Sequence, residues 1–147
     1  MQQILVKTQT AKTVIHIGTD VLQTRLPILI DGQDNFVVTD SNVFALYYPF
    51  FQTYFKKDKI FVLPHGEANK NFASLQAILE QMIGAGLRRT SKLFAVGGGV
   101  IGDLAGLAAS LYMRGIPFVQ IPTTLLAQVD SSVGGKTAID LDGVKNV

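Results

Sequence analysis

The stretch KLFAVGGGVIGD, residues 92–103, decides the fold, because a short apolar run ends in three glycines and a second apolar segment follows. Residues 92–96 predict a buried strand, and residues 100–113 predict a helix. That helix would turn one apolar side inward, formed by Leu104, Leu107, Ala108 and Leu111. Glycines at such a junction let the backbone approach a ligand closely, and the helix N-terminus offers unpaired N–H groups that suit a pyrophosphate. The spacing is not G-x-G-x-x-G, so the usual dinucleotide fingerprint is absent, and the alternative is a tight turn that needs glycine.

The rest of the chain predicts further alternation of strands and helices. Apolar runs indicate strands at 36–39, 59–63 and 118–121, and a hairpin is expected between Ile4 and Ile17. Residues 41–55 predict a helix that Pro49 breaks or kinks, and a short helical piece is expected near 125–128. A further helix is marked by an apolar stripe at Phe72, Leu75, Leu79, Met82 and Ile83. We therefore expect one α/β domain over residues 1–147, with a mostly parallel sheet flanked by helices and an N-terminal β-hairpin.

Composition excludes several classes of protein. The chain has 147 residues, of which 48% are hydrophobic and 16% charged, so a packed core is expected. The net charge of +2 is too small to indicate a nucleic-acid partner. No apolar run reaches the length of a membrane span, and the N-terminus lacks the features of a signal peptide, so a cytoplasmic protein without a membrane partner is expected. Cysteine is absent, and His16 and His65 lie far apart, so no metal site is assigned.

Polar residues follow the predicted strands, where parallel sheets bind their ligands. They are Asp40, Glu67, Lys70, Asp103, Thr123 and Thr124. Each has a plainer reading. Asp40 and the threonines could cap helices, and the local evidence favours capping. Glu67 and Lys70 could pair at i,i+3 in a plain turn, which the local evidence also favours, and Asp103 could simply complement a helix dipole in the first turn.

A second glycine-containing loop, GGKT at 134–137, resembles a phosphate loop only superficially. Four residues before Gly135 stands Ser131 and not glycine, so an ATP-binding P-loop is rejected. Lys136 could still hold a phosphate as a point charge.

Taken together, these segments resemble one enzyme family. Residues 97–146 are similar to the core signature of 3-dehydroquinate synthase, PHGEANK at 64–70 to its Pro-x-Gly-Glu-x-x-Lys loop, and VTDSN at 38–42 to its Asp-x-Asn site. The resemblance implies a Rossmann-like, NAD-binding N-terminal domain. The family's C-terminal helical domain, which holds the metal, would lie beyond Val147.

The resemblance also implies roles for individual residues. The cofactor NAD would be bound by Asp40, Asn42, Glu67, Lys70, Gly98, Gly99, Val100, Asp103, Thr123, Thr124, Leu126 and Lys145. Substrate binding and catalysis would involve Asp130, Lys136 and Asn146, together with Arg114. Arg114 resembles an arginine that reaches the neighbouring subunit's site, which implies a homodimer.

The implied reaction converts 3-deoxy-D-arabino-heptulosonate 7-phosphate, a sugar phosphate, into 3-dehydroquinate and phosphate in the shikimate pathway, which leads to chorismate and the aromatic amino acids. It uses catalytic NAD and a divalent metal, zinc or cobalt, whose ligands would be absent from residues 1–147, so this chain alone is expected to be inactive. Three alternatives stay open: a related sugar-phosphate cyclase such as 2-deoxy-scyllo-inosose synthase, a glycerol or iron-type alcohol dehydrogenase domain, and a non-catalytic nucleotide-binding module. The matches at Arg114 and Asn146 favour 3-dehydroquinate synthase over the other cyclases, and the tail GGKTAIDLDGVKN argues against the dehydrogenases.

Overall fold

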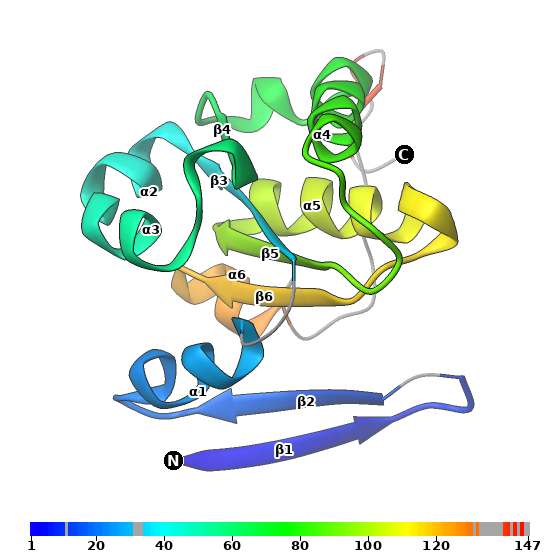
Figure 1. Cartoon of the computed structure of the whole chain (residues 1–147). Helices are drawn as coiled ribbons and strands as arrows, with labels where there is room; N and C mark the ends of the chain where they lie inside the picture. The colour runs from blue at the N-terminus through cyan, green and yellow to red at the C-terminus, as the bar shows by residue number, and fades with distance from the viewer. Residues whose placement is uncertain are drawn as a thin grey trace. The chain divides into compact units, whose positions relative to one another are not determined.

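The computed structural model describes residues 1–10, 12–30, 34–130, 132, 140, 141, 143 and 145. Its contacts divide the chain into two units, Met1–Gly32 and Gln33–Val147 (Figure 1). The expectation that residues 1–147 form one domain stays a prediction.

The first unit contains a hairpin and a helix. Strands β1 (Gln2–Lys7) and β2 (Lys12–Ile17) pair antiparallel, which confirms the predicted hairpin. Helix α1 (Val21–Ile30) follows and was not predicted. It carries Pro27 in its interior, and an internal proline is a signal against a helix because it removes a hydrogen-bond donor.

The second unit is built on a four-stranded parallel sheet in the order β4-β3-β5-β6. Its strands are β3 (Asn35–Asp40), β4 (Ile60–Leu63), β5 (Lys92–Gly97) and β6 (Phe118–Pro122). All four were predicted as strands, and the parallel pairing confirms the fold class.

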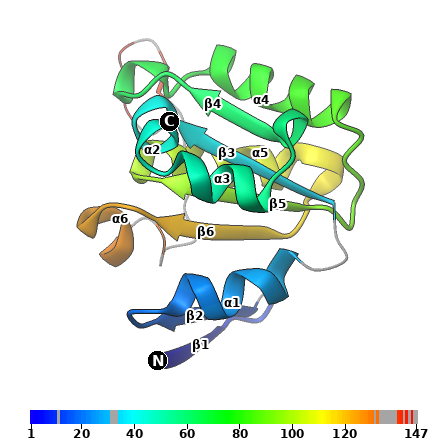
Figure 2. The same cartoon turned by 60° about the vertical axis from the view of Figure 1, so that its left-hand side comes forward.

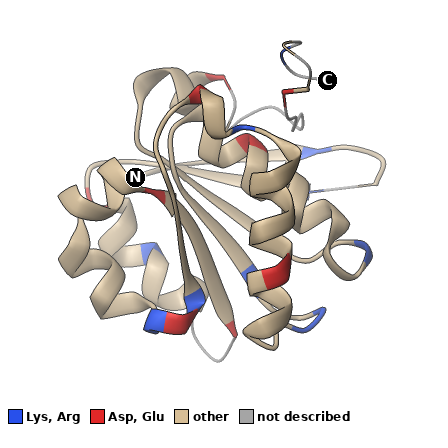
Figure 3. Ribbon diagram, turned by 90° about the horizontal axis from the view of Figure 1, so that it is seen from above, with Lys and Arg blue, Asp and Glu red and all other residues tan. Residues whose placement is uncertain are grey.

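Helices cover both faces of this sheet. Helices α2 (Ser41–Leu46) and α3 (Tyr48–Tyr54) lie on one face, and α4 (Phe72–Gly84) and α5 (Gly99–Leu111) lie on the other (Figure 2). Charged residues are sparse on these elements (Figure 3): α4 and α5 each carry one acidic residue, whereas α2 and α3 carry no charged residue. Pro49 lies in the first turn of α3, so the predicted break is confirmed.

Shorter elements complete the second unit. Helix α6 (Leu125–Val129) follows β6 and confirms the predicted helical piece. Three 3-10 turns are η1 (Lys57–Lys59), η2 (Glu67–Asn69) and η3 (Tyr112–Arg114). Among the described residues, no helix is long and apolar enough to cross a membrane.

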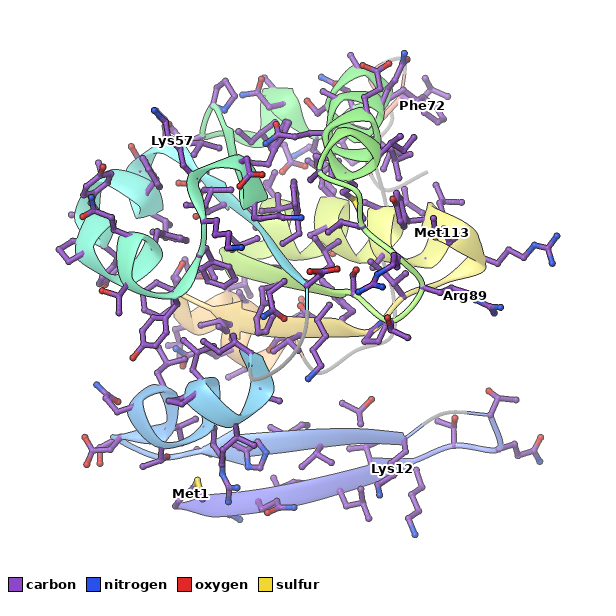
Figure 4. The ribbon with its side chains drawn as sticks, in the orientation of Figure 1. Met1, Lys12, Lys57, Phe72, Arg89 and Met113 are labelled. Carbon is purple, nitrogen blue, oxygen red and sulfur yellow. The ribbon has the colours of Figure 1, made fainter. Side chains whose placement is uncertain are left out.

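The main core lies between the sheet and helices α4 and α5. Helix α4 buries Leu75, Ile78 and Met82. By contrast, Phe72 is 54% exposed and points outward in Figure 4, and Ile83 is 67% exposed. The predicted stripe was therefore wrong at both ends, because a period of 3.6 residues places Ile78 on the same side as Leu75 and Met82.

Helix α5 also differs from its prediction. It buries Ile101, Leu104, Ala105 and Ala108, while Leu111 is 54% exposed. The helix ends at Leu111 and not at Met113, because Tyr112 has an extended backbone (φ −64°, ψ 122°). The inward side of α5 is thus made largely of small residues, which lets the helix lie close to the strands.

Candidate functional site

The candidate site lies where the chain changes direction across the sheet. From β3 the chain moves outward to β4, and it then crosses back to β5 and continues outward to β6 on the other side. The carboxyl ends of β3 and β5 are therefore neighbours at a topological switch point, which is where open parallel sheets bind ligands. Asp40 ends β3, and Gly97 ends β5 directly before Gly98, so the predicted site residues Asp40 and Gly98 flank this point.

The glycine turn joins β5 to α5 at the switch point. A side chain on Gly97 would place its Cβ 2.8 Å from Cβ of Ile101, so packing alone requires this glycine, as the tight-turn reading proposed. Gly98 differs, because its φ of −82° suits any residue and a Cβ there would lie 3.4 Å from Cγ2 of Thr124, an ordinary contact. Gly98 is the N-cap of α5, and no described side chain caps that end of the helix. Its first amides can therefore receive an anion.

Thr123 and Thr124 lie beside this turn. The amide of Thr123 donates to the carbonyl of Gly97 at 3.0 Å, which joins the end of β6 to the glycine turn. The hydroxyl oxygen of Thr124 accepts from the amide of Ala127 at 3.1 Å and caps α6, so the local reading of Thr124 as a cap is confirmed.

Asp40 and its neighbours form the other side of the switch point. Oδ1 of Asp40 accepts from the amide of Val43 at 2.8 Å, which confirms the helix-cap reading, and Asn42 is exposed. Ser41 Oγ accepts from the amide of His65 at 3.1 Å and lies 3.2 Å from its Nδ1. This link between the ends of β3 and β4 was not predicted, and no local pattern in the sequence indicates it.

Lys70 and Asp103 form a partly buried ion pair. Nζ of Lys70 lies 2.8 Å from Oδ2 of Asp103, and the two side chains are 5% and 19% exposed. Among the described residues the ion pair of Lys70 is with Asp103 and not with Glu67, so the i,i+3 reading was wrong. Asp103 is also the fifth residue of α5 and lies beyond its first turn, so the dipole reading was wrong as well.

A pocket of about 290 Å³ lies next to this ion pair. It is lined by Glu67, Ala68, Lys70, Asn71, Asp140, Leu141, Gly143 and Lys145. The amide of Asp140 donates to the carbonyl of Lys70 at 2.7 Å and holds the two lining segments together. Three residues predicted for the cofactor, Glu67, Lys70 and Lys145, thus surround one pocket. A larger pocket of about 410 Å³ lies in the first unit, but none of the predicted site residues lines it.

The remaining predicted residues are dispersed. Asp130 is exposed at the end of α6, and Leu126 is 71% exposed. Arg114 is exposed and follows the C-terminal end of α5, whereas the glycine turn lies at the N-terminal end of that helix. Its neighbour Met113 is labelled in Figure 4, far from the carboxyl ends of the strands. Lys136 and Asn146 lie outside the described residues. Among the described residues, no three His, Cys, Asp or Glu side chains gather in a way that could hold a metal ion.

The fold and the glycine turn define a Rossmann-like domain, and the solved structures that it resembles are sugar-phosphate cyclases. The chain is similar to a crystal structure of 2-deoxy-scyllo-inosose synthase with carbaglucose-6-phosphate, NAD⁺ and Co²⁺ (TM-score 0.82, 27% identity, 99% of this chain and 42% of that chain). It is also similar to 2-epi-5-epi-valiolone synthase from Streptomyces hygroscopicus subsp. jinggangensis with NAD⁺ and Zn²⁺ (TM-score 0.76, 30% identity, 96% of this chain and 41% of that chain).

Within that class, the chain belongs to the family of 3-dehydroquinate synthase N-terminal domains, which residues 60–147 match. Curated relatives carry the name 3-dehydroquinate synthase. The protein from Caldanaerobacter subterraneus subsp. tengcongensis is 49% identical over 80% of this chain and 34% of its own length. That from Shewanella denitrificans is 44% identical over 100% of this chain and 42% of its own length. The chain therefore spans well under half of the relatives that it matches.

Proposed function

We propose that this chain is the NAD-binding part of a 3-dehydroquinate synthase, which converts 3-deoxy-D-arabino-heptulosonate 7-phosphate into 3-dehydroquinate and phosphate in the shikimate pathway. The relatives of that name are 44% and 49% identical to the chain, whereas the two other cyclases are 27% and 30% identical. The difference favours 3-dehydroquinate synthase over its sister activities. The reaction itself belongs to a protein longer than residues 1–147, and the chain by itself is expected to be inactive.

The observation that carries the cofactor assignment is the glycine turn at the switch point. The N-terminus of α5 has no side-chain cap among the described residues, and Gly98 presents bare backbone next to Thr124. Unpaired amides and the positive end of the helix dipole favour a diphosphate. The proposed arrangement places the diphosphate over Gly98, Gly99 and Val100 and the adenosine near Asp40 and Asn42. When bound, NAD supplies a hydride acceptor that is reduced and then reoxidised within one turnover.

The chain's own residues are proposed to bind and orient the substrate. Asp130, Lys136 and Asn146 are proposed to contact the substrate, with Lys136 as a cation for an anionic group. A divalent metal, zinc or cobalt, does not fit the described residues, because they contain no suitable cluster of ligands. We derive no step through the metal and assign its ligands to the remainder of the longer protein.

Arg114 supports the proposal of a homodimer. Helix α5 separates Arg114 from the glycine turn, and its 13 residues span roughly 20 Å at 1.5 Å per residue. Arg114 is thus poorly placed to serve the site of its own chain and better placed to serve that of a partner. Sedimentation of the longer protein as a monomer, with full activity, would contradict this part of the proposal.

Calorimetry with NAD⁺ tests the cofactor assignment. Gly98→Ala should fold normally, because the backbone of Gly98 suits alanine and the new methyl group meets Thr124 at an ordinary distance. The methyl group would nevertheless occupy the surface offered to the diphosphate, and we expect NAD⁺ binding to weaken about tenfold or more. Gly84→Ala is the matched control, because nothing lies within 4 Å of its Cβ. Equal affinity in both variants would refute the assigned position.

The reaction is tested with the full-length coding sequence that contains this region. Release of phosphate from 3-deoxy-D-arabino-heptulosonate 7-phosphate, and not from glucose 6-phosphate, is expected. Turnover of glucose 6-phosphate alone would assign the protein to the 2-deoxy-scyllo-inosose synthases, and steady accumulation of NADH with an alcohol would assign it to the dehydrogenases.

A further inference from the structure

The first unit contains a pocket that the proposed function does not use. Its volume is about 410 Å³, which is within the range of pockets that bind small molecules. All its lining residues belong to Met1–Gly32, and they are Met1, Thr19, Asp20, Val21, Thr24 and Arg25. A Cβ on Gly18 would lie 3.2 Å from both Cα of Met1 (Figure 4) and Cγ2 of Val21. The absence of a side chain at Gly18 therefore lets Met1 lie close to the start of α1, where the pocket forms.

Two side chains of opposite charge line this pocket without pairing with each other. Among the described residues, neither the carboxylate of Asp20 nor the guanidinium of Arg25 takes part in an ion pair. Asp20 is exposed, so a charged ligand can reach its carboxylate. The hydroxyl of Thr24 donates to the backbone carbonyl of Asp20 at 3.0 Å and is thus used within the helix. The pocket therefore offers a carboxylate and a guanidinium to the same ligand.

Arg25 has a buried hydrogen-bond donor that lacks an acceptor. Its Nε is buried and has no hydrogen-bond partner in the part of the chain that the structure describes. A buried donor without an acceptor costs free energy, and native proteins keep few of them. Nε and one Nη of a guanidinium form a planar fork that matches the two oxygens of a carboxylate. A ligand carboxylate at this edge would supply the acceptor that Arg25 needs.

We propose that this pocket binds a small zwitterion of the α-amino acid class, with its carboxylate on Arg25 and its ammonium group on Asp20. The carboxylate of Asp20 selects against phosphate and other purely anionic ligands, because like charges in one small pocket repel each other. Met1 and Val21, which also line the pocket, would contact the ligand's side chain. The inference goes beyond the proposed function, because no residue proposed for the cofactor or the substrate lies in Met1–Gly32.

Nuclear magnetic resonance titration of the chain with L-leucine tests this site, and two analogues of similar shape separate the two charges. Isocaproate lacks the amino group of L-leucine, and isopentylamine lacks its carboxylate. We expect L-leucine to shift the amide resonances of Thr24 and Arg25 with a dissociation constant on the order of 1 mM, because a small ligand makes few contacts in an open pocket. Each analogue should bind at least about tenfold more weakly, because it loses one charge-assisted contact.

Two variants and a matched control assign the contacts. Arg25→Met and Asp20→Asn should each weaken L-leucine binding about tenfold or more, because each removes one of the two charges. Asparagine is as good a helix-capping residue as aspartate, so Asp20→Asn should not disturb the start of α1. Arg89→Met removes the same charge from an exposed arginine of the second unit and should leave the affinity for L-leucine unchanged. In the absence of ligand, Arg25→Met should not lower the urea midpoint, because Nε has no hydrogen bond to lose.

Three results would overturn the inference. A lower urea midpoint in Arg25→Met would show that Arg25 supports the fold. Equal binding of isocaproate and L-leucine would show that the pocket selects an anion and not a zwitterion. L-leucine that shifted no resonance of Met1–Gly32 would show that the pocket binds no α-amino acid of this size.

Discussion

The fold alters the titration of Tyr112. It is buried, its hydroxyl donates to the carbonyl of Leu87 at 2.7 Å, and burial raises the pKa of its phenol above the ordinary value of 10.0. The folded state therefore keeps this proton at pH values where the unfolded chain loses it. The contribution of the protonated Tyr112 phenol to the free energy of unfolding is complete below about pH 10, and it is lost as the pH rises through the raised pKa.

Tyr112→Phe should make the free energy of unfolding fall less steeply above pH 10 than in the unmodified chain. At neutral pH the same change should cost about 1–2 kcal/mol, because the carbonyl of Leu87 loses its donor. Urea unfolding at a series of pH values measures both effects. Tyr47→Phe, at an exposed ring, is the control. Parallel pH profiles for Tyr112→Phe and the unmodified chain would contradict the prediction.

At the same scale, sequence alone predicts the residues whose partners are local. Asp40 and Thr124 were read as helix caps, and both cap a helix through an amide three residues later. The local readings of Lys70 and Asp103 were wrong, because Lys70 was paired with Glu67 and Asp103 with the dipole of its own helix, whereas the two residues pair with each other. Local patterns contain no information about which distant side chains the fold brings together, so the ion pair could not be predicted from them.

The turn between β5 and α5 allows a test at the level of elements. Gly97→Ala would place a methyl group 2.8 Å from Cβ and Cγ1 of Ile101, which belong to the first turns of a helix that cannot shift without moving the core. We expect a loss of about 1–3 kcal/mol in the free energy of unfolding. Gly84→Ala, with open space at its Cβ, should be neutral or stabilising by up to about 1 kcal/mol. Denaturant unfolding that gave equal stability for the two variants would show that the turn can relax.

The elements themselves were largely predictable, because their apolar spacing is regular. The strands of the parallel sheet and helices α2 to α6 all correspond to runs or stripes in the sequence. Helix α1 was missed because Pro27 interrupts its pattern, and the end of α5 was placed too late because Leu111 and Met113 are apolar but exposed. Hydrophobic residues on a surface give the same signal as buried ones, so sequence alone cannot separate them.

At the scale of the whole molecule, the core and the candidate site belong to the same unit. Every member of the main hydrophobic cluster, from Phe36 to Ile116, lies in the unit Gln33–Val147. All the residues proposed for the cofactor lie there too. The hairpin strands β1 and β2, by contrast, are mostly exposed, and a two-stranded hairpin is at best marginally stable in water.

A chain that begins at Gln33 should therefore fold cooperatively and still bind NAD⁺. Because the deletion removes no member of the main cluster, the urea unfolding transition should remain single, and the affinity for NAD⁺ in calorimetry should change by less than about threefold. The variant Lys70→Met within the shortened chain serves as a control for weakened binding. A broad, non-cooperative transition would show that the core depends on residues 1–32. Cooperative unfolding without binding would instead show that the first unit contributes to the cofactor site, which would extend that site beyond the parallel sheet.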